Sequence, residues 1–195
     1  MIVKICGITT AEDAETAIEA GAAALGFNFY PRSPRFITPE RARAITVELP
    51  ASVLKVGIFV NESPAAIRAG VAEAGLDVAQ VIGGAPGAGV RYWMVQRVSA
   101  DFSAEQLADA NAEAFLLDTP SDSLYGGTGH SFDWTRANIP GRRIILAGGL
   151  GPDNIAEAIR ASRPWGVDAC SRLEREPGRK DPGKVKAFVQ AALNV

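Results

Sequence analysis

The chain has 195 residues, of which 47% are hydrophobic and 22% are charged, as is usual for one globular domain. Lysine and arginine number 20 against 22 aspartate and glutamate, and this balance argues against a general nucleic-acid surface. No apolar run approaches the roughly eighteen residues that would cross a membrane. An anionic small substrate stays compatible with the composition, because one phosphate needs only a few local donors.

The cysteines and the first residues indicate the compartment. Cys6 and Cys170 are too few for the disulfide framework of a small secreted protein. Residues 1–7 already have the pattern of a strand, so we expect no signal peptide before the fold. We expect a cytoplasmic protein, with one domain over residues 1–195 and with no membrane or nucleic-acid partner.

Eight short runs of β-branched and apolar residues recur along the chain and predict strands. They lie near residues 2–6, 23–29, 54–60, 78–82, 92–98, 114–118, 143–147 and 165–170. Steps of 16 to 31 residues separate consecutive strand ends, which is too long for hairpins and suits crossover connections between parallel strands. A closed (β/α)8 TIM barrel is the economical arrangement, and an open, doubly wound sheet is the alternative.

Several connections carry helix-start signals. Residues 38–40 (TPE) and 63–64 (SP) place a capping hydroxyl before a proline at the first helical position. Further helices are expected after residues 152–154 (PDN), ending near residue 161, and from residues 180–182 (KDP) onward. Residues 83–89 read GGAPGAG, a composition that disfavours a helix. We therefore predict a shortened or missing helix after the fourth strand.

Two strand ends carry candidate acid–base residues. Barrel enzymes place catalytic groups where strands end, at the C-terminal face of the barrel. Cys6 closes the first strand, on the same face as Lys4, and Asp118 closes the sixth. A thiol and a carboxyl facing each other there form a candidate base and acid for proton transfer. The plainer alternatives are a buried apolar filler for Cys6 and a turn cap for Asp118.

Glycines and polar residues after the last two strands indicate an anion site. Gly148 and Gly149 follow the seventh strand, and Ser171 and Arg172 follow the eighth. Barrels commonly bind phosphate in these two loops with backbone N–H groups. A tight turn is the alternative explanation for the glycine pair.

Three further features lie in loops. In the loop YPRSPRF at residues 30–36, Arg35 is a candidate donor to a carboxylate, whereas we expect Arg32 to be exposed. The segment YGGTG at residues 125–129, with Gly127, is typical of a loop that covers a substrate. His130 has no evident partner and is expected to be exposed. No His, Cys and carboxylate cluster has the spacing of a metal site.

Taken in order, several blocks of the sequence resemble phosphoribosylanthranilate isomerases. They are KICGIT at 4–9, GFNFYPRSPRFITPE at 26–40, KVGIFVNE at 55–62, LLDT at 116–119, YGGTG at 125–129, AGGLGPDN at 147–154, and GVD through PGRKD at 166–181. The blocks run in the order of the family over nearly the whole chain. The opening block together with LLDT and GGTG is highly specific.

The resemblance implies an activity in tryptophan biosynthesis. The family converts N-(5′-phosphoribosyl)anthranilate to 1-(o-carboxyphenylamino)-1-deoxyribulose 5-phosphate by an Amadori rearrangement, without metal or organic cofactor. By resemblance, Asp118 is the general acid that protonates the furanose ring oxygen, and Cys6 is the general base that takes the C2′ proton. The implied substrate-binding residues are Arg35 for the anthranilate carboxylate, Gly127, and Gly148, Gly149, Ser171 and Arg172 for the phosphate. Members are monomers or homodimers, so both states stay open.

The chain departs from the family pattern in three places. Residues 80–83 read QVIG where the family has QLHG, residues 96–97 read QR where it has KA, and residues 170–172 read CSR where it has SSG. The departures leave two alternatives: a related sugar-phosphate isomerase with altered or dual specificity, and a catalytically silent barrel that binds a phosphate ligand. Retention of Cys6, Asp118 and Arg35 favours the isomerase.

The position of the second cysteine follows from the barrel, because the first and last strands are neighbours when a barrel closes. Cys170 is therefore expected near Cys6, where it fills space at the barrel rim. A disulfide that blocks the base is the alternative. Lys4 is expected to favour the Cys6 thiolate electrostatically.

Overall fold

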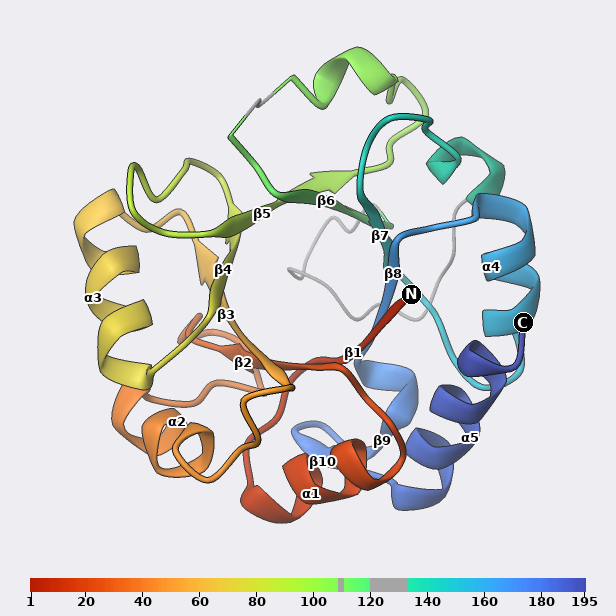
Figure 1. The fold of residues 1–195 in the computed structure, drawn as a ribbon. Helices are drawn as coiled ribbons and strands as arrows, with labels where there is room; N and C mark the ends of the chain where they lie inside the picture. Colours follow the sequence, from red (N-terminus) through yellow and green to blue (C-terminus); the bar gives the residue numbers. More distant parts are fainter. Residues whose placement is uncertain (109–110, 120–132) are drawn as a thin grey trace.

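The computed structural model describes residues 1–108, 111–119 and 133–195. Eight parallel strands form a closed barrel in chain order, β1 to β8 (Figure 1). They are β1 Ile2–Ile5, β2 Ala24–Asn28, β3 Leu54–Val60, β4 Val78–Ile82, β5 Tyr92–Arg97, β6 Ala114–Asp118, β7 Ile144–Leu146 and β8 Gly166–Ala169. Each predicted strand is confirmed to within one residue at either end. The closed barrel is confirmed, and the open sheet is wrong.

The barrel closes where β8 pairs with β1. In the parallel register, Lys4 lies opposite Asp168 and Ile5 opposite Ala169. The backbone N–H of Cys6 continues the ladder by donating to the carbonyl of Ala169 at 2.9 Å. Closure satisfies the backbone groups that a free edge strand would expose.

Within the described residues, five α-helices cover part of the barrel (Figure 1). They are α1 Ala11–Glu19, α2 Pro39–Thr46, α3 Pro64–Ala74, α4 Ile155–Ser162 and α5 Pro182–Leu193. The predicted helix starts are confirmed: the hydroxyls of Thr38 and Ser63 cap α2 and α3, and the carboxylate of Asp181 caps α5. Each of these caps is followed by proline, whose fixed φ suits the first helical position.

The ring of helices is thinner than the sequence suggested. Residues 83–91 connect β4 to β5 without a helix, as predicted. The described residues of the next two connections hold only short 3₁₀ turns, η1 Ala104–Gln106 and η2 Trp134–Ala137, where full helices were expected. The guanidinium of Arg136 in η2 donates to the carbonyls of Ser99 and Phe102. The arginine side chain thus supplies hydrogen bonds to these carbonyls, which backbone N–H groups would supply if the residues after β5 formed a helix.

Side chains fill the lower part of the barrel. Alternate residues of the strands point inward and form a buried cluster: Ala24, Val56, Val78, Trp93, Ala114, Leu116, Ile145 and Ala147. Trp93 is completely buried, and its ring meets that of Trp165 edge-on, with 6.1 Å between centroids. A larger cluster packs the outer faces of the strands against the helices. Because the interior is filled from below, space for a ligand is left at the carboxyl ends of the strands.

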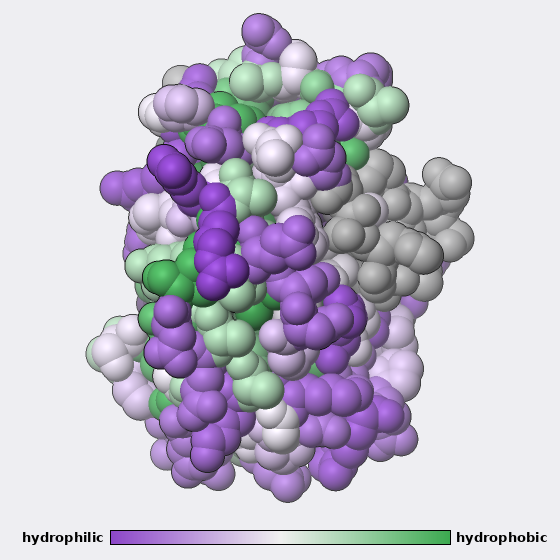
Figure 2. Space-filling view, turned by 90° about the vertical axis from the view of Figure 1, so that its right-hand side faces the viewer, coloured by the Kyte–Doolittle hydropathy of each residue, from purple (hydrophilic) through white to green (hydrophobic). Residues whose placement is uncertain are grey.

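One face of the molecule is mostly polar (Figure 2). The face drawn in Figure 2 is largely hydrophilic, with smaller hydrophobic areas between the polar side chains. The large apolar side chains that are exposed include those of Phe36, Val47 and Leu193. None of the helices in the described parts of the chain has the length and apolar character needed to span a membrane.

Trp93→Ala tests the packed interior. We expect the free energy of unfolding to fall by about 3–5 kcal/mol, because a large ring is removed from a site that the closed barrel cannot collapse. Urea unfolding measures the change. Val47→Ala is the control, since Val47 is 59% exposed, and should change stability by less than about 0.5 kcal/mol. Equal effects of the two substitutions would contradict the packing described.

Candidate active site

A pocket opens at the carboxyl ends of the strands, and all eight strands or the loops directly after them contribute to it. Its lining residues include Cys6, Asn28, Arg35, Ile58, Gln80, Val95, Asp118, Gly148, Gly149, Asp168, Cys170 and Ser171. The structure therefore brings the candidate base, the candidate acid and the candidate phosphate loops to one place. These residues are far apart in the sequence, but they meet because the carboxyl ends of all the parallel strands lie at the same end of the barrel.

An ion pair lies beneath Cys6, inside the barrel. The ammonium of Lys4 donates to Asp168 Oδ1 at 2.8 Å, and both residues are buried. A β-carbon at Gly26 would come within 2.9 Å of Cys6 Sγ and 3.0 Å of Lys4 Nζ, so glycine leaves room for both groups. Although burial opposes it, the negative partners Asp168 and Cys6 raise the pKa of Lys4 above its usual value. The thiol therefore has a charged ammonium close by.

Asp118 is the last residue of β6, and its carboxyl has a raised pKa. Its Oδ1 accepts the backbone N–H of Thr119 at 2.8 Å. Burial raises the pKa of Asp118 to about 6, against the opposing effects of that hydrogen bond and of Arg97 and Lys4. Gly148 packs closely against it, with a φ of +87° and a hypothetical β-carbon only 2.9 Å from Asp118 Oδ1. A carboxyl with this pKa can hold and deliver a proton near neutral pH.

The turn after β7 forms another wall of the pocket. Gly148 and Gly149 both have positive φ, a conformation that glycine adopts without strain. The carbonyl of Gly149 accepts hydrogen bonds from Asn154 Nδ2 at 2.9 Å and Arg172 Nη1 at 3.0 Å. Arg172 also forms an ion pair with Asp153 at 2.9 Å. The structure thus places Arg172 behind the turn, where it fixes the backbone, while Ser171 lines the pocket directly.

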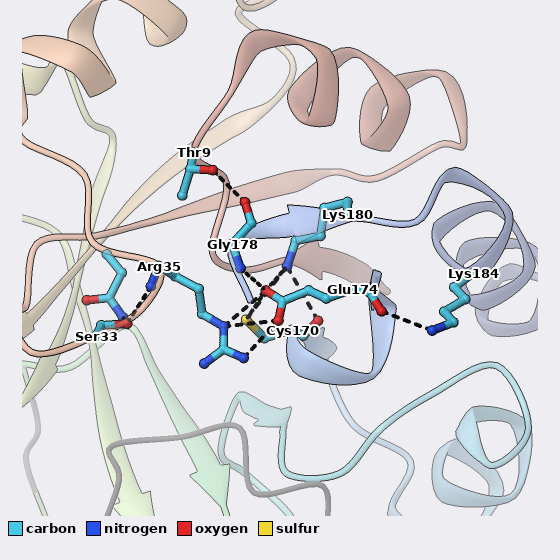
Figure 3. A network of polar contacts seen from close by, with 9 residues as sticks. Thr9, Ser33, Arg35, Cys170, Glu174, Gly178, Lys180 and Lys184 are labelled. Carbon is cyan, nitrogen blue, oxygen red and sulfur yellow. Dashed lines mark hydrogen bonds and ion pairs between the residues drawn. The ribbon is translucent and has the colours of Figure 1, made fainter. Parts of the chain in front are cut away.

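Arg35 lines the pocket beside a second buried ionic cluster (Figure 3). Its Nε and Nη2 atoms donate to the carboxylate of Glu174 at 3.0 and 2.8 Å. The ammonium of Lys180 donates to the same carboxylate at 3.0 Å. Although burial opposes it, these two cations hold the pKa of Glu174 below its usual value. Arg32, by contrast, is exposed, as predicted.

Sequence reasoning missed the roles of Glu174 and Lys180. They lie on a short hairpin after β8, formed by β9 Glu174–Glu176 and β10 Arg179–Lys180. Lys180 belongs to the PGRKD block, which marked it as part of a motif without indicating burial. Its contacts depend on where the hairpin folds back over the barrel mouth, and no spacing in the sequence specifies that.

Gln80 was also not singled out as a site residue. It points into the barrel from β4, is buried, and lines the pocket. Within the described residues, its Oε1 atom has no hydrogen-bond partner, which suits a polar group of a ligand. Period-two alternation with Val78 was the available signal.

Two sequence predictions fall outside the described residues: Gly127 with the YGGTG segment, and His130. For metals, the described ranges contain no group of three His, Cys, Asp or Glu side chains arranged to hold an ion. The two cysteines are free thiols, and Cys170 packs against the buried cluster that contains Cys6.

Comparisons with known proteins agree with this geometry. The family model described as N-(5′-phosphoribosyl)anthranilate (PRA) isomerase matches residues 3–191. The chain belongs to the phosphoribosylanthranilate isomerase family. A relative of that name from Solibacter usitatus is 51% identical, covering 98% of this chain and 97% of its own, and one from Trichlorobacter lovleyi is 48% identical, covering 97% of each.

Solved structures of the phosphoribosylanthranilate isomerase family have the same barrel. The enzyme from Thermotoga maritima superposes with a TM-score of 0.91 at 39% identity over the full length of both chains. Another phosphoribosyl anthranilate isomerase structure, in complex with reduced 1-(o-carboxyphenylamino)-1-deoxyribulose 5-phosphate, gives a TM-score of 0.87 at 37% identity, again over both full chains. The family resemblance inferred from the motifs is therefore confirmed.

The unusual pKa of Asp118 is directly measurable. We expect its carboxyl-carbon chemical shift to titrate near pH 6, because burial disfavours the charged form. Asp118→Asn identifies the signal by removing it. Arg97→Met should move the midpoint higher, since Arg97 favours the carboxylate. A midpoint near 4, the usual value for aspartate, would contradict the described environment.

Proposed function

We propose that this chain isomerises N-(5′-phosphoribosyl)anthranilate to 1-(o-carboxyphenylamino)-1-deoxyribulose 5-phosphate, the step that its family performs in tryptophan biosynthesis. The observation that carries the proposal is the placement of Cys6 and Asp118 on one pocket at the barrel mouth. The reaction moves protons and forms no bond to an external group. Acid–base side chains therefore suffice, and the proposal includes no metal or organic cofactor.

Asp118 acts as the general acid in this proposal. With a pKa of about 6, it is protonated in a useful fraction of molecules near neutral pH. It delivers its proton to the furanose ring oxygen, the C1′–O bond breaks, and the anthranilate nitrogen donates its electron pair to give a cationic Schiff base. Arg97 and Lys4 favour the carboxylate that forms.

Cys6 acts as the general base. The cationic nitrogen of the Schiff base makes the neighbouring C2′ proton acidic, so a thiolate is strong enough to remove it. The resulting enolamine takes a proton at C1′ and loses the proton of its 2′-hydroxyl, which gives the ketone. The C1′ proton comes from the Cys6 thiol and the hydroxyl proton returns to the Asp118 carboxylate, so both groups regain their starting protonation states. Lys4 favours the thiolate from below, because its ammonium lies beside Cys6 Sγ.

Binding groups surround this acid–base pair. We propose that the phosphate binds to the backbone at Gly148, Gly149 and Ser171, and that Arg172 supports this site by holding the turn. Arg35 binds the anthranilate carboxylate through Nη1, the guanidinium nitrogen that does not contact Glu174. Gly127 remains a proposed contact of the substrate.

A second candidate is a related sugar-phosphate isomerase with altered or dual specificity. The departures at the ends of β4 and β5 line a second hollow at the mouth that also reaches Asp118, with Ile82, Gln96 and Arg97 among its residues. They therefore lie where a bound substrate would contact the protein. A catalytically silent barrel is less favoured, because the acid, the base and Arg35 are all in the pocket.

The oligomeric state and the cellular location remain proposals. A solved structure from Thermotoga maritima is titled as monomers generated from a dimeric phosphoribosylanthranilate isomerase. For this chain we propose either a monomer or a homodimer. We propose the cytoplasm as its location.

Loss of substrate fluorescence tests the proposed reaction. Given freshly formed phosphoribosylanthranilate, the parent should turn over, and Cys6→Ser and Asp118→Asn should each lower kcat by about 100-fold or more, since each removes a proton-transfer group. Circular dichroism checks that the variants fold. A folded parent without turnover would point to the altered substrate or to the silent barrel. Full activity in either variant would remove that residue from its role.

Arg35→Lys tests carboxylate binding. We expect KM to rise about tenfold with a smaller change in kcat, because a lysine cannot bind Glu174 and a carboxylate in paired geometry. Arg32→Lys is the matched control from the same loop, since Arg32 is exposed, and should leave both constants unchanged. Equal KM values for parent and Arg35→Lys would contradict the assignment.

A further inference from the structure

The two cysteines of the chain lie side by side at the barrel mouth. Cys6 follows β1 and Cys170 follows β8, and the closing register of these strands brings them together. Their thiols are free, and Cys170 packs against the small buried cluster that contains Cys6. Both line the pocket, together with Asp118. The proposed base therefore has a second thiol as its immediate neighbour.

The surroundings of Cys170 suit both of its protonation states (Figure 3). As a thiolate it accepts from Lys180 Nζ, which is 3.7 Å from its sulfur. As a thiol it donates to Glu174 Oε1 at 3.8 Å. Arg35 faces the same sulfur and favours the negative form. Lys180 is completely buried, so its charge is little screened by water.

Cys6 has its own cation on the other side of the thiol pair. Lys4 lies beneath it, with an ammonium that bonds Asp168 and favours a negative charge on Cys6. A negative charge on the pair is thus stabilised on either sulfur, by Lys4 at Cys6 or by Lys180 at Cys170. Such an arrangement allows a proton to pass between the sulfurs while the remaining negative charge stays near a cation.

We propose that Cys170 is a positioning residue that accepts the proton of Cys6, so that Cys6 meets the substrate as a thiolate. This inference rests on the proposed function, because it assigns a partner to the proposed base. In the step, the S–H bond of Cys6 breaks as an S–H bond forms on the Cys170 thiolate, and no electrons are exchanged. Cys6 takes the C2′ proton, which leaves the pair uncharged, and the pair then gives a proton to C1′ and returns to its starting charge of one thiolate and one thiol.

The acidities of the two thiols agree with a shared proton. The neighbouring Cys6 thiol, helped by Lys180 and Arg35 against the effect of burial, lowers the pKa of Cys170 to about 7. The neighbouring Cys170 thiol and burial together raise the pKa of Cys6 well above its usual value, against the effect of Lys4. The pair therefore loses its first proton near neutral pH and retains the second one.

Direct titration of the thiols tests the inference without substrate. The ultraviolet absorbance of thiolate is recorded against pH for the parent, Cys6→Ser and Cys170→Ser, all kept reduced with a phosphine. Because the chain has two cysteines, each variant retains one thiol. We expect the parent to show a thiolate forming near pH 7 and both variants to lose it, since neither sulfur then has its partner.

Lys180→Met extends the test to the cation. It should raise the first thiol midpoint by about one pH unit or more, whereas Lys184→Met should not. Lys184 is the matched control, because it bonds the backbone carbonyl of Glu174. In the isomerase assay near neutral pH, Cys170→Ser should lower kcat about tenfold with KM unchanged.

The outcomes separate this inference from the proposed function. A thiol that still titrates near pH 7 in Cys170→Ser, or unchanged kcat in that variant, would overturn the role of Cys170. A parent that lacks isomerase activity but shows the shared low midpoint would overturn the proposed function and leave the coupled thiols in place. If Cys170→Ser raised KM and lowered kcat while the thiol titration stayed unchanged, Cys170 would act only through side-chain packing. That result would contradict its role as a proton acceptor.

Discussion

The closing of the barrel between β1 and β8 is the constraint on which the site depends. Lys4 and Asp168 are 164 positions apart in the chain, yet they are register partners and form a buried ion pair of 2.8 Å. Breaking one partner of such a pair leaves an uncompensated buried charge and costs about 3–5 kcal/mol. The ion pair therefore stabilises the register that places Cys6 beside Cys170, since a shifted β8 would leave both charges unpaired.

The filled interior then determines where chemistry takes place. Trp93 and the inward aliphatic side chains occupy the barrel interior, so polar groups gather at the strand ends. There, burial raises the pKa of both carboxyls: for Asp118 it prevails and gives a pKa of about 6, whereas at Glu174 the paired cations Arg35 and Lys180 outweigh it and lower the pKa. One pocket thus contains a carboxyl that can give up a proton and thiols that can take one.

Much of this organisation was predictable from the sequence, because strand patterns and helix caps are local. The eight strands, the caps at Thr38 and Ser63, and the missing helix after β4 all follow from residues close in the chain. Contacts that join distant loops were not predictable. The pairing of Arg35 with Glu174, the burial of Lys180 and the position of Arg172 behind the Gly149 turn depend on how the β9–β10 hairpin and the β7 loop fold over the mouth.

In the proposed complex, one substrate spans the pocket between Cys6, Asp118, Arg35 and the glycine turn. A crystal structure of this protein with reduced 1-(o-carboxyphenylamino)-1-deoxyribulose 5-phosphate would show the position of each part of the ligand. We expect the phosphate at the backbone of Gly148, Gly149 and Ser171, the carboxylate on Arg35, and the ribulose carbons between the thiol and the carboxyl. A ligand bound elsewhere, or in the pocket with its sugar carbons out of reach of both Cys6 and Asp118, would rule out this arrangement.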